Sequence, residues 1–177
     1  MMALSTVPIS HPVACMAALD GKTVVLGRSD ACVLAMWTVL SSTGPELLAT
    51  VDLGCSSSIT FVLNLGNGRL LAGSGKTMTV IEVERAVRNQ LKIKATVAID
   101  STPLGALRLA NGKILLFGES GFLGFFEIDT GQLELIEVGE IIKSASFTAA
   151  AVLPDGRILV ATDCSQLAII DAHQAAT

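Results

Sequence analysis

The sequence predicts an all-β protein built from about four repeats of four antiparallel strands, and three observations support this prediction. The turn signal Asp/Asn-Gly-Lys/Arg occurs four times, with glycines that are 47, 44 and 44 residues apart. An apolar run of strand length follows each signal. A later segment in the second repeat alternates between apolar and mostly polar residues, which is typical of a half-buried strand.

Each repeat begins with a hairpin. The turn signals lie at residues 20–22, 67–69, 111–113 and 155–157. Asx-Gly dipeptides favour type I′ turns, so each turn is expected to join a first strand to a second strand. Second strands are predicted at residues 23–26, 70–72, 114–117 and 158–161. Small-residue turns then lead to third strands, which are expected to end near residues 38, 84, 129 and 171.

A fourth, outer strand is predicted in the first three repeats, at residues 46–53, 91–100 and 133–139. The second of these segments shows the alternation. Its apolar residues Leu91, Ile93, Ala95, Val97 and Ile99 alternate with Lys92, Lys94, Thr96, Ala98 and Asp100. The fourth repeat stops after its third strand.

Four-stranded units that repeat every 44 to 47 residues are typical of β-propeller blades. We expect one propeller domain over residues 1–177, with blades at about residues 13–53, 58–100, 102–140 and 146–171. Three interpretations of the incomplete fourth blade remain open. Residues 2–9 return as its outer strand and close a four-bladed ring, or the ring is partial and is completed by a second copy or another protein, or the chain is a piece of a longer product.

The repeats resemble the WD40-like propeller family. Ile128-Asp129 and Ile170-Asp171 end their third strands at the place of that family's Trp-Asp dipeptide. The resemblance is degenerate, because no Gly-His pair precedes a blade and the first two repeats end in Trp37-Thr38 and Val83-Glu84. Residues 127–132 are also similar to quinoprotein-type propeller repeats.

Composition limits the classes of partner. Lys and Arg number 12 against 16 Asp and Glu, a net charge of -4, so nucleic acid is not an expected partner. Residues 1–12 lack Lys, Arg and an apolar run of signal-peptide length, and no apolar stretch is long enough to cross a membrane. We therefore expect a cytoplasmic protein that binds no membrane. The four cysteines form no C-x-x-C pair and are expected to be buried reduced thiols.

No catalytic, metal-binding or cofactor-binding residues are predicted. His11 and His173 lie near opposite ends of the chain, and no carboxylate pair or metal-spaced set recurs across the repeats. Residues 72–77 end like a phosphate-binding loop, but Leu70 stands where that motif needs glycine, so a hairpin turn is expected there. The protein is therefore not expected to be an enzyme or to need a cofactor.

Five residues are candidates for partner binding: Arg85, Arg88, Lys92, Lys94 and Phe122. The four basic residues hold a third of the positive charge, and they would either steer a charged protein or form cross-strand pairs on a solvated face. Phe122 is expected either in the core or as an exposed anchor. Trp37, the single tryptophan, is expected to be buried between blades.

Hydrophobic residues make up 51% of the chain and charged residues only 16%, too few polar side chains to cover a monomer. This excess favours external completion of the ring. The leading hypothesis is a non-enzymatic protein–protein interaction scaffold that works as a subunit of an assembly. The alternative is a small closed propeller that binds a ligand or a metal in its central channel, with hydrolysis as one activity such a site supports.

Overall fold

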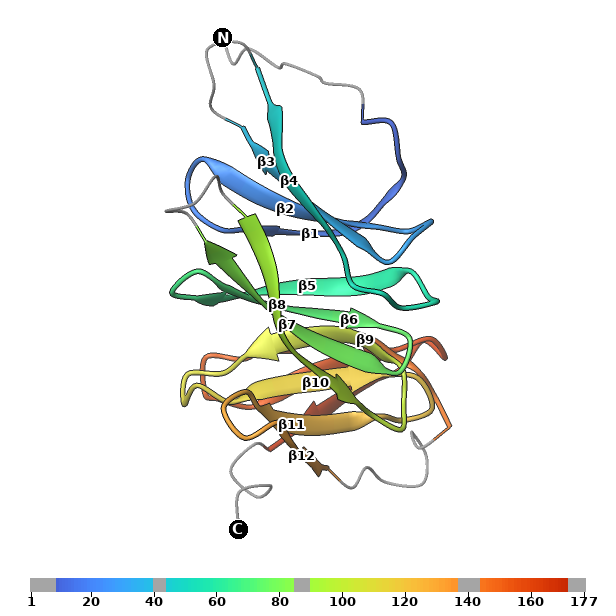
Figure 1. Ribbon diagram of the computed structural model, residues 1–177. Helices are drawn as coiled ribbons and strands as arrows, with labels where there is room; N and C mark the ends of the chain where they lie inside the picture. The colour runs from blue at the N-terminus through green and yellow to red at the C-terminus, as the bar shows by residue number, and fades with distance from the viewer. Residues whose placement is uncertain (1–8, 40–43, 85–89, 137–143, 172–177) are drawn as a thin grey trace, which may run out of the picture. The chain divides into compact units, whose positions relative to one another are not determined.

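The computed structural model describes residues 9–39, 44–84, 90–136 and 144–171. The described residues form strands, turns and bends arranged as four antiparallel sheets, which confirms the all-β prediction (Figure 1). The chain divides into two compact units, Met1–Thr96 and Val97–Thr177, and each unit is described by itself.

The first unit contains blades 1 and 2. Blade 1 has the strand order β1-β2-β3-β4, with bounds Val13–Ala18, Thr23–Arg28, Val33–Thr38 and Glu46–Asp52. Blade 2 has the order β5-β6-β7-β8, with bounds Ile59–Gly66, Arg69–Ser74, Thr77–Glu84 and Gln90–Ala98. The last two residues of β8 fall beyond the unit boundary. Every predicted second strand in this unit is present and is one or two residues longer at its ends than predicted.

The second unit contains blades 3 and 4. Blade 3 pairs its strands in the order β9-β10-β11-β12, with bounds Pro103–Arg108, Ile114–Gly118, Leu123–Glu127 and Gln132–Leu135. Blade 4 has three described strands in the order β13-β14-β15, with bounds Phe147–Val152, Ile158–Thr162 and Leu167–Ile170. Residues 2–8, predicted as part of a ring-closing strand, lie outside the described residues.

The four Asx-Gly turns do not share one conformation. Asn67 and Gly68 both have positive φ, 52° and 72°, which is the type I′ turn that the sequence predicts. The other three turns are not of this type, which corrects the prediction for them. In each, the Oδ1 atom of the Asx residue accepts a hydrogen bond from the backbone N–H two residues later; these residues are Asp20, Asn111 and Asp155.

Each unit buries apolar side chains between its two blades. In the first unit, one core cluster joins Val25, Leu34 and Met36 of blade 1 to Leu70, Ala72 and Ile81 of blade 2. In the second unit, one cluster joins Leu115, Phe117 and Phe125 of blade 3 to Phe147, Ile158 and Val160 of blade 4. Within each unit, we call the face of the first blade that packs on the second blade its rear face, and the face of the second blade that meets it its front face. The same register positions define the rear faces of blades 2 and 4 and the front faces of blades 1 and 3.

One cross-strand pair between the first and second strands recurs on the rear faces. The pair is Cys15 with Gly27, Phe61 with Gly73, Gly105 with Phe117, and Ala149 with Ala161. In blades 2 and 3 an aromatic ring lies across the glycine, because a Cβ atom at Gly73 or Gly105 would overlap the ring of its partner. Blade 4 has two alanines here, so its rear face lacks the ring.

Replacing Gly68 by Ala tests the one type I′ turn. The left-handed backbone at Gly68 strains any other L residue, and an added Cβ would lie 3.4 Å from the carbonyl oxygen of Val83. We expect Gly68→Ala to lower the free energy of unfolding by about 1–2 kcal/mol in urea titrations.

Gly21→Ala is the matched control in the blade 1 turn. Nothing lies within 4 Å of a Cβ atom at Gly21, and its φ is not positive. Its free energy of unfolding is expected to change by less than about 0.5 kcal/mol. Equal losses for the two substitutions would contradict the assignment of strain to Gly68.

Candidate functional site

The predicted basic segment is only partly described. Arg85 and Arg88 lie outside the described residues. Lys92 and Lys94 lie exposed on β8 and pair with glutamates of the neighbouring strand β7: Lys92 Nζ is 3.4 Å from Glu84 Oε1, and Lys94 Nζ contacts Glu82 Oε2. The hydrogen bond to Glu82 raises the pKa of Lys94. The two lysine charges are therefore balanced locally, and their role in binding a partner stays a prediction.

Phe122 is buried, with 6% of its surface exposed. Of the two alternatives for this residue, the burial agrees with core packing, and a role of Phe122 in binding a partner stays a prediction. Phe125 and Phe126 are buried too, on β11. Neighbouring strand residues point to opposite sides of a sheet, so burial of both rings requires that both faces of this strand are covered.

The front face of blade 1 carries an apolar groove of about 180 Å³. Side chains from all four strands of blade 1 line it, among them Val13, Leu26, Val33, Ala35, Trp37 and Leu47. Alternation along the strands explains this set, because Val25, Leu34 and Met36 between them point to the rear face. Leu47 is 52% exposed and Val13 is 43% exposed.

Trp37 is part of this groove rather than buried between blades, which corrects the prediction for it. It is opposite Leu47 in the pairing of β3 with β4 and opposite Val24 in the pairing of β2 with β3. Its Nε1–H group is buried and has no hydrogen-bond partner among the described residues. The groove thus combines apolar walls with one unsatisfied donor.

The rear face of blade 4 is apolar at every central position. The register of β13, β14 and β15 places these six residues on it: Ala149, Ala151, Leu159, Ala161, Leu167 and Ile169. Leu167 is 72% exposed and Ile169 is 55% exposed. The opposite residues along the same strands, Ile158 and Val160, are fully buried against blade 3.

The equivalent rear-face residues of the other blades are far less exposed than those of blade 4. Val25, Leu71 and Leu115 occupy the same position in their second strands as Leu159 and are completely buried. Leu159 is only partly buried, and its neighbours Leu167 and Ile169 on β15 are both more than half exposed. The sequence does not distinguish this exposed face from a buried one, because each of its strands has the same apolar pattern as the core strands.

Two further features of the described residues carry no binding site of their own. The loop-like segment at residues 72–77 is a β6–β7 hairpin, as predicted, in which Ser74 pairs with Thr77. A hollow of about 510 Å³ on blade 3 is lined by Lys113, but this lysine already lies 3.6 Å from Glu134 and over the Phe125 ring.

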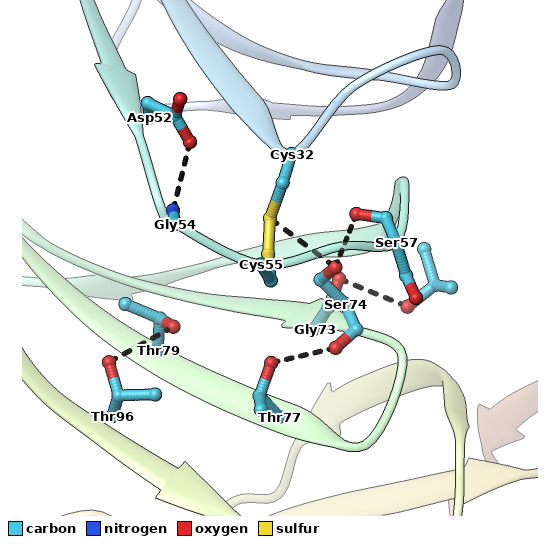
Figure 2. Close-up of a disulfide and its surroundings, with 11 residues drawn as sticks. Cys32, Asp52, Gly54, Cys55, Ser57, Gly73, Ser74, Thr77, Thr79 and Thr96 are labelled. Atoms are coloured by element: carbon cyan, nitrogen blue, oxygen red, sulfur yellow. Dashed lines mark hydrogen bonds between the residues drawn. A yellow bond between two sulfur atoms is a disulfide. The ribbon is translucent and has the colours of Figure 1, made fainter.

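Cys32 and Cys55 form a disulfide, which corrects the expectation that these two cysteines are reduced (Figure 2). Their Cα atoms are 5.6 Å apart. The bond joins the β2–β3 turn of blade 1 to the segment that leads into blade 2 (Figure 2). The hydroxyl of Ser74 lies 3.4 Å from Cys32 Sγ and donates a hydrogen bond to the carbonyl oxygen of Ser57.

The other two cysteines are free, as predicted, but differ in exposure. Cys15 is partly buried, and this burial raises the pKa of its thiol to about 11. Cys164 is exposed, which corrects the expectation that it is buried, and a hydrogen bond to the Asp163 carboxylate raises the pKa of its thiol.

Over the described ranges, no group of three or more His, Cys, Asp or Glu residues is placed to hold a metal ion. No helix among these residues is long and apolar enough to span a bilayer.

The repeated sheets, with apolar front and rear faces, define a β-propeller fold. Among solved structures, the chain is similar to the crystal structure of the WD40 beta propeller domain of Doa1, with a TM-score of 0.72 and 14% sequence identity. The match covers 90% of this chain and 51% of that chain, so this chain spans about half the length of the solved domain. The likeness confirms the WD40-type propeller fold that the repeats predict. No family model matches the chain, and no curated protein does.

Reducing the disulfide tests its contribution to stability. The bond closes a loop with a sequence separation of 23 residues, and loops of this size give about 3 kcal/mol through the entropy of the unfolded chain. We expect a phosphine reductant to lower the free energy of unfolding of the wild-type chain by about 3 kcal/mol, which lowers its urea midpoint. The Cys32→Ala/Cys55→Ala variant should have the lower midpoint with or without reductant. A wild-type midpoint that is the same in both conditions would show that the bond is absent or has no effect.

Alkylation rates test the two free thiols. Iodoacetamide at pH 8 should modify Cys164 well before Cys15, because Cys164 is exposed and burial keeps Cys15 protonated. Asp163→Asn removes the charge that raises the pKa of Cys164 and should speed its modification. Mass spectrometry of peptides would follow both sites. Equal rates for Cys15 and Cys164 in the folded chain would contradict this assignment.

Proposed function

We propose that this chain is a non-enzymatic protein-binding module, a WD40-like propeller segment that works as a subunit of a protein assembly. One observation carries the proposal: of the six apolar residues on the rear face of blade 4, four are exposed and two are partly buried, while the equivalent second-strand and third-strand positions of blades 1 to 3 are buried. Contiguous apolar patches on soluble proteins commonly mark interaction sites.

The energetic gain from covering this face is substantial. Full burial of a Leu or Ile side chain contributes roughly 1.5–3 kcal/mol, and Leu167 and Ile169 are both more than half exposed. The surrounding alanines lose little side-chain entropy when a partner packs against them. The face is therefore suited to a partner that also presents an apolar surface.

The edge of blade 4 adds a second reason for a protein partner. Blades 1 to 3 each pair their third strand with a fourth, whereas β15 ends its sheet among the described residues. An edge strand offers backbone N–H and C=O groups to an incoming strand. A protein can satisfy both the apolar face and this edge, whereas a small ligand covers neither completely.

Three further parts of the hypothesis concern the fold, the basic residues and the cellular location. The propeller fold, which the likeness to the Doa1 domain shows, is one that proteins commonly use for protein interaction. Lys92 and Lys94 are paired with Glu84 and Glu82. They can attract a negatively charged partner only if that partner competes with these glutamates for the lysine charges. A cytoplasmic location, as proposed from the sequence, requires the Cys32–Cys55 disulfide to form in a reducing compartment, where disulfides are rare.

Photo-crosslinking in the cells that express the full chain tests the proposal. A benzoylphenylalanine at position 169 should give a discrete adduct of higher mass, because Ile169 is 55% exposed on the rear face, on the edge strand β15. The same probe at position 135 is the control, since Leu135 is 65% exposed but lies on the outer strand of blade 3. Mass spectrometry of the adduct identifies the partner. If position 169 gives no more adduct than position 135, the proposed function is wrong.

A further inference from the structure

We propose that the partner on the rear face of blade 4 is the front face of blade 1 in a second copy of this chain. The two copies then form a head-to-tail dimer with two identical joints. This inference rests on the proposed function and names the partner that it leaves open.

The chain already contains the joint that the dimer repeats. In the first unit, the rear face of blade 1 packs on the front face of blade 2, and in the second unit the rear face of blade 3 packs on the front face of blade 4. Both joints bury apolar residues of the second and third strands. Among the described residues of each unit, no blade packs on the front face of blade 1 or on the rear face of blade 4, so these two are the matching kinds of surface.

The sizes of the side chains on the two faces are complementary. The Ala149–Ala161 pair of blade 4 replaces the Phe–Gly pairs of blades 2 and 3, which leaves the rear face of blade 4 shallow. On the front face of blade 1, Trp37 occupies the third-strand position that Ile81, Phe126 and Ile170 hold in blades 2, 3 and 4, and it is the largest of the four side chains. The face with small residues thus meets the face with the larger side chain.

An apolar contact here leaves no charge without a partner. None of the six rear-face residues of blade 4 is charged. Arg28 lies in the groove of blade 1, but its Nε and Nη2 atoms each donate a 2.8 Å hydrogen bond to the Asp30 carboxylate. Burial of the groove therefore does not isolate the guanidinium from its counter-charge.

A second copy of this chain presents both kinds of face, a rear face of blade 4 and a front face of blade 1. Two-fold symmetry lets the rear face of each copy meet the front face of the other, which covers all four faces and stops further growth.

Light scattering on a sizing column, over a concentration series, tests the dimer with three variants. The wild-type chain should have twice the monomer mass of 18.3 kDa. Ile169→Glu on the rear face and Leu47→Glu on the front face should each raise the dissociation constant at least about 100-fold, because a buried unpaired carboxylate removes several kcal/mol. Leu135→Glu, also on an outer strand, should change it less than about threefold. Circular dichroism verifies that each variant is folded.

Mixing the two interface variants separates this dimer from other arrangements. Ile169→Glu keeps an intact front face and Leu47→Glu keeps an intact rear face, so the mixture should form a dimer through the one intact joint. Rear-to-rear packing instead predicts that Leu47→Glu alone stays dimeric, and that result would overturn the proposal.

Trp37 reports on the joint directly, since it is the single tryptophan and lines the groove. Its emission should shift to shorter wavelength as wild-type concentration rises. Ile169→Glu should abolish the shift although the substitution lies in another blade.

The outcomes also separate this inference from the proposed function. A wild-type monomer at all concentrations, with a crosslinked adduct of a different protein at position 169, overturns the dimer and leaves the proposed function standing. A monomer with no adduct overturns both.

Discussion

The rest of the structure depends on the fact that no blade buries its own core. A four-stranded sheet has two faces, and the strands of this chain carry apolar residues on both, so each face needs a neighbouring sheet. Val25, Leu34 and Met36 become buried only because Leu70, Ala72 and Ile81 lie opposite them. Stability therefore comes from the packing between blades, and the faces without a neighbouring blade are the surfaces on which a partner can pack.

Periodicity in the sequence predicted the elements well because strands and turns are local. The second strand predicted at residues 158–161 is Ile158–Thr162 in the structure, and the outer strand predicted at 46–53 is Glu46–Asp52. Turn type was predicted less well, since only Asn67-Gly68 adopts the left-handed pair. At the other three turns the Asx side chain accepts a hydrogen bond from the backbone N–H two residues later. An Asx-Gly dipeptide is compatible with this side-chain turn and with the type I′ turn, so the dipeptide alone does not predict which one forms.

The candidate site could not be predicted in the same way, because exposure depends on the neighbour rather than on the strand itself. Leu159 and Leu115 have the same place in the same pattern, yet one is partly exposed and the other is fully buried. The position of Trp37 was predicted wrongly for the same reason. The Cys32–Cys55 disulfide joins a turn to a linker, so no spacing rule within one strand indicates it.

The composition is explained by the same constraint. A chain with 51% hydrophobic and 16% charged residues has more apolar surface than four blades bury within two units. Part of the excess lies on Leu167 and Ile169 of the rear face of blade 4 and on Val13, Met16 and Leu47 of the front face of blade 1. Leu135, on the outer strand of blade 3, is exposed as well and belongs to neither face. Because polar substitutions would be tolerated at solvent-facing positions, the apolar residues kept there fit surfaces that are covered when the protein works.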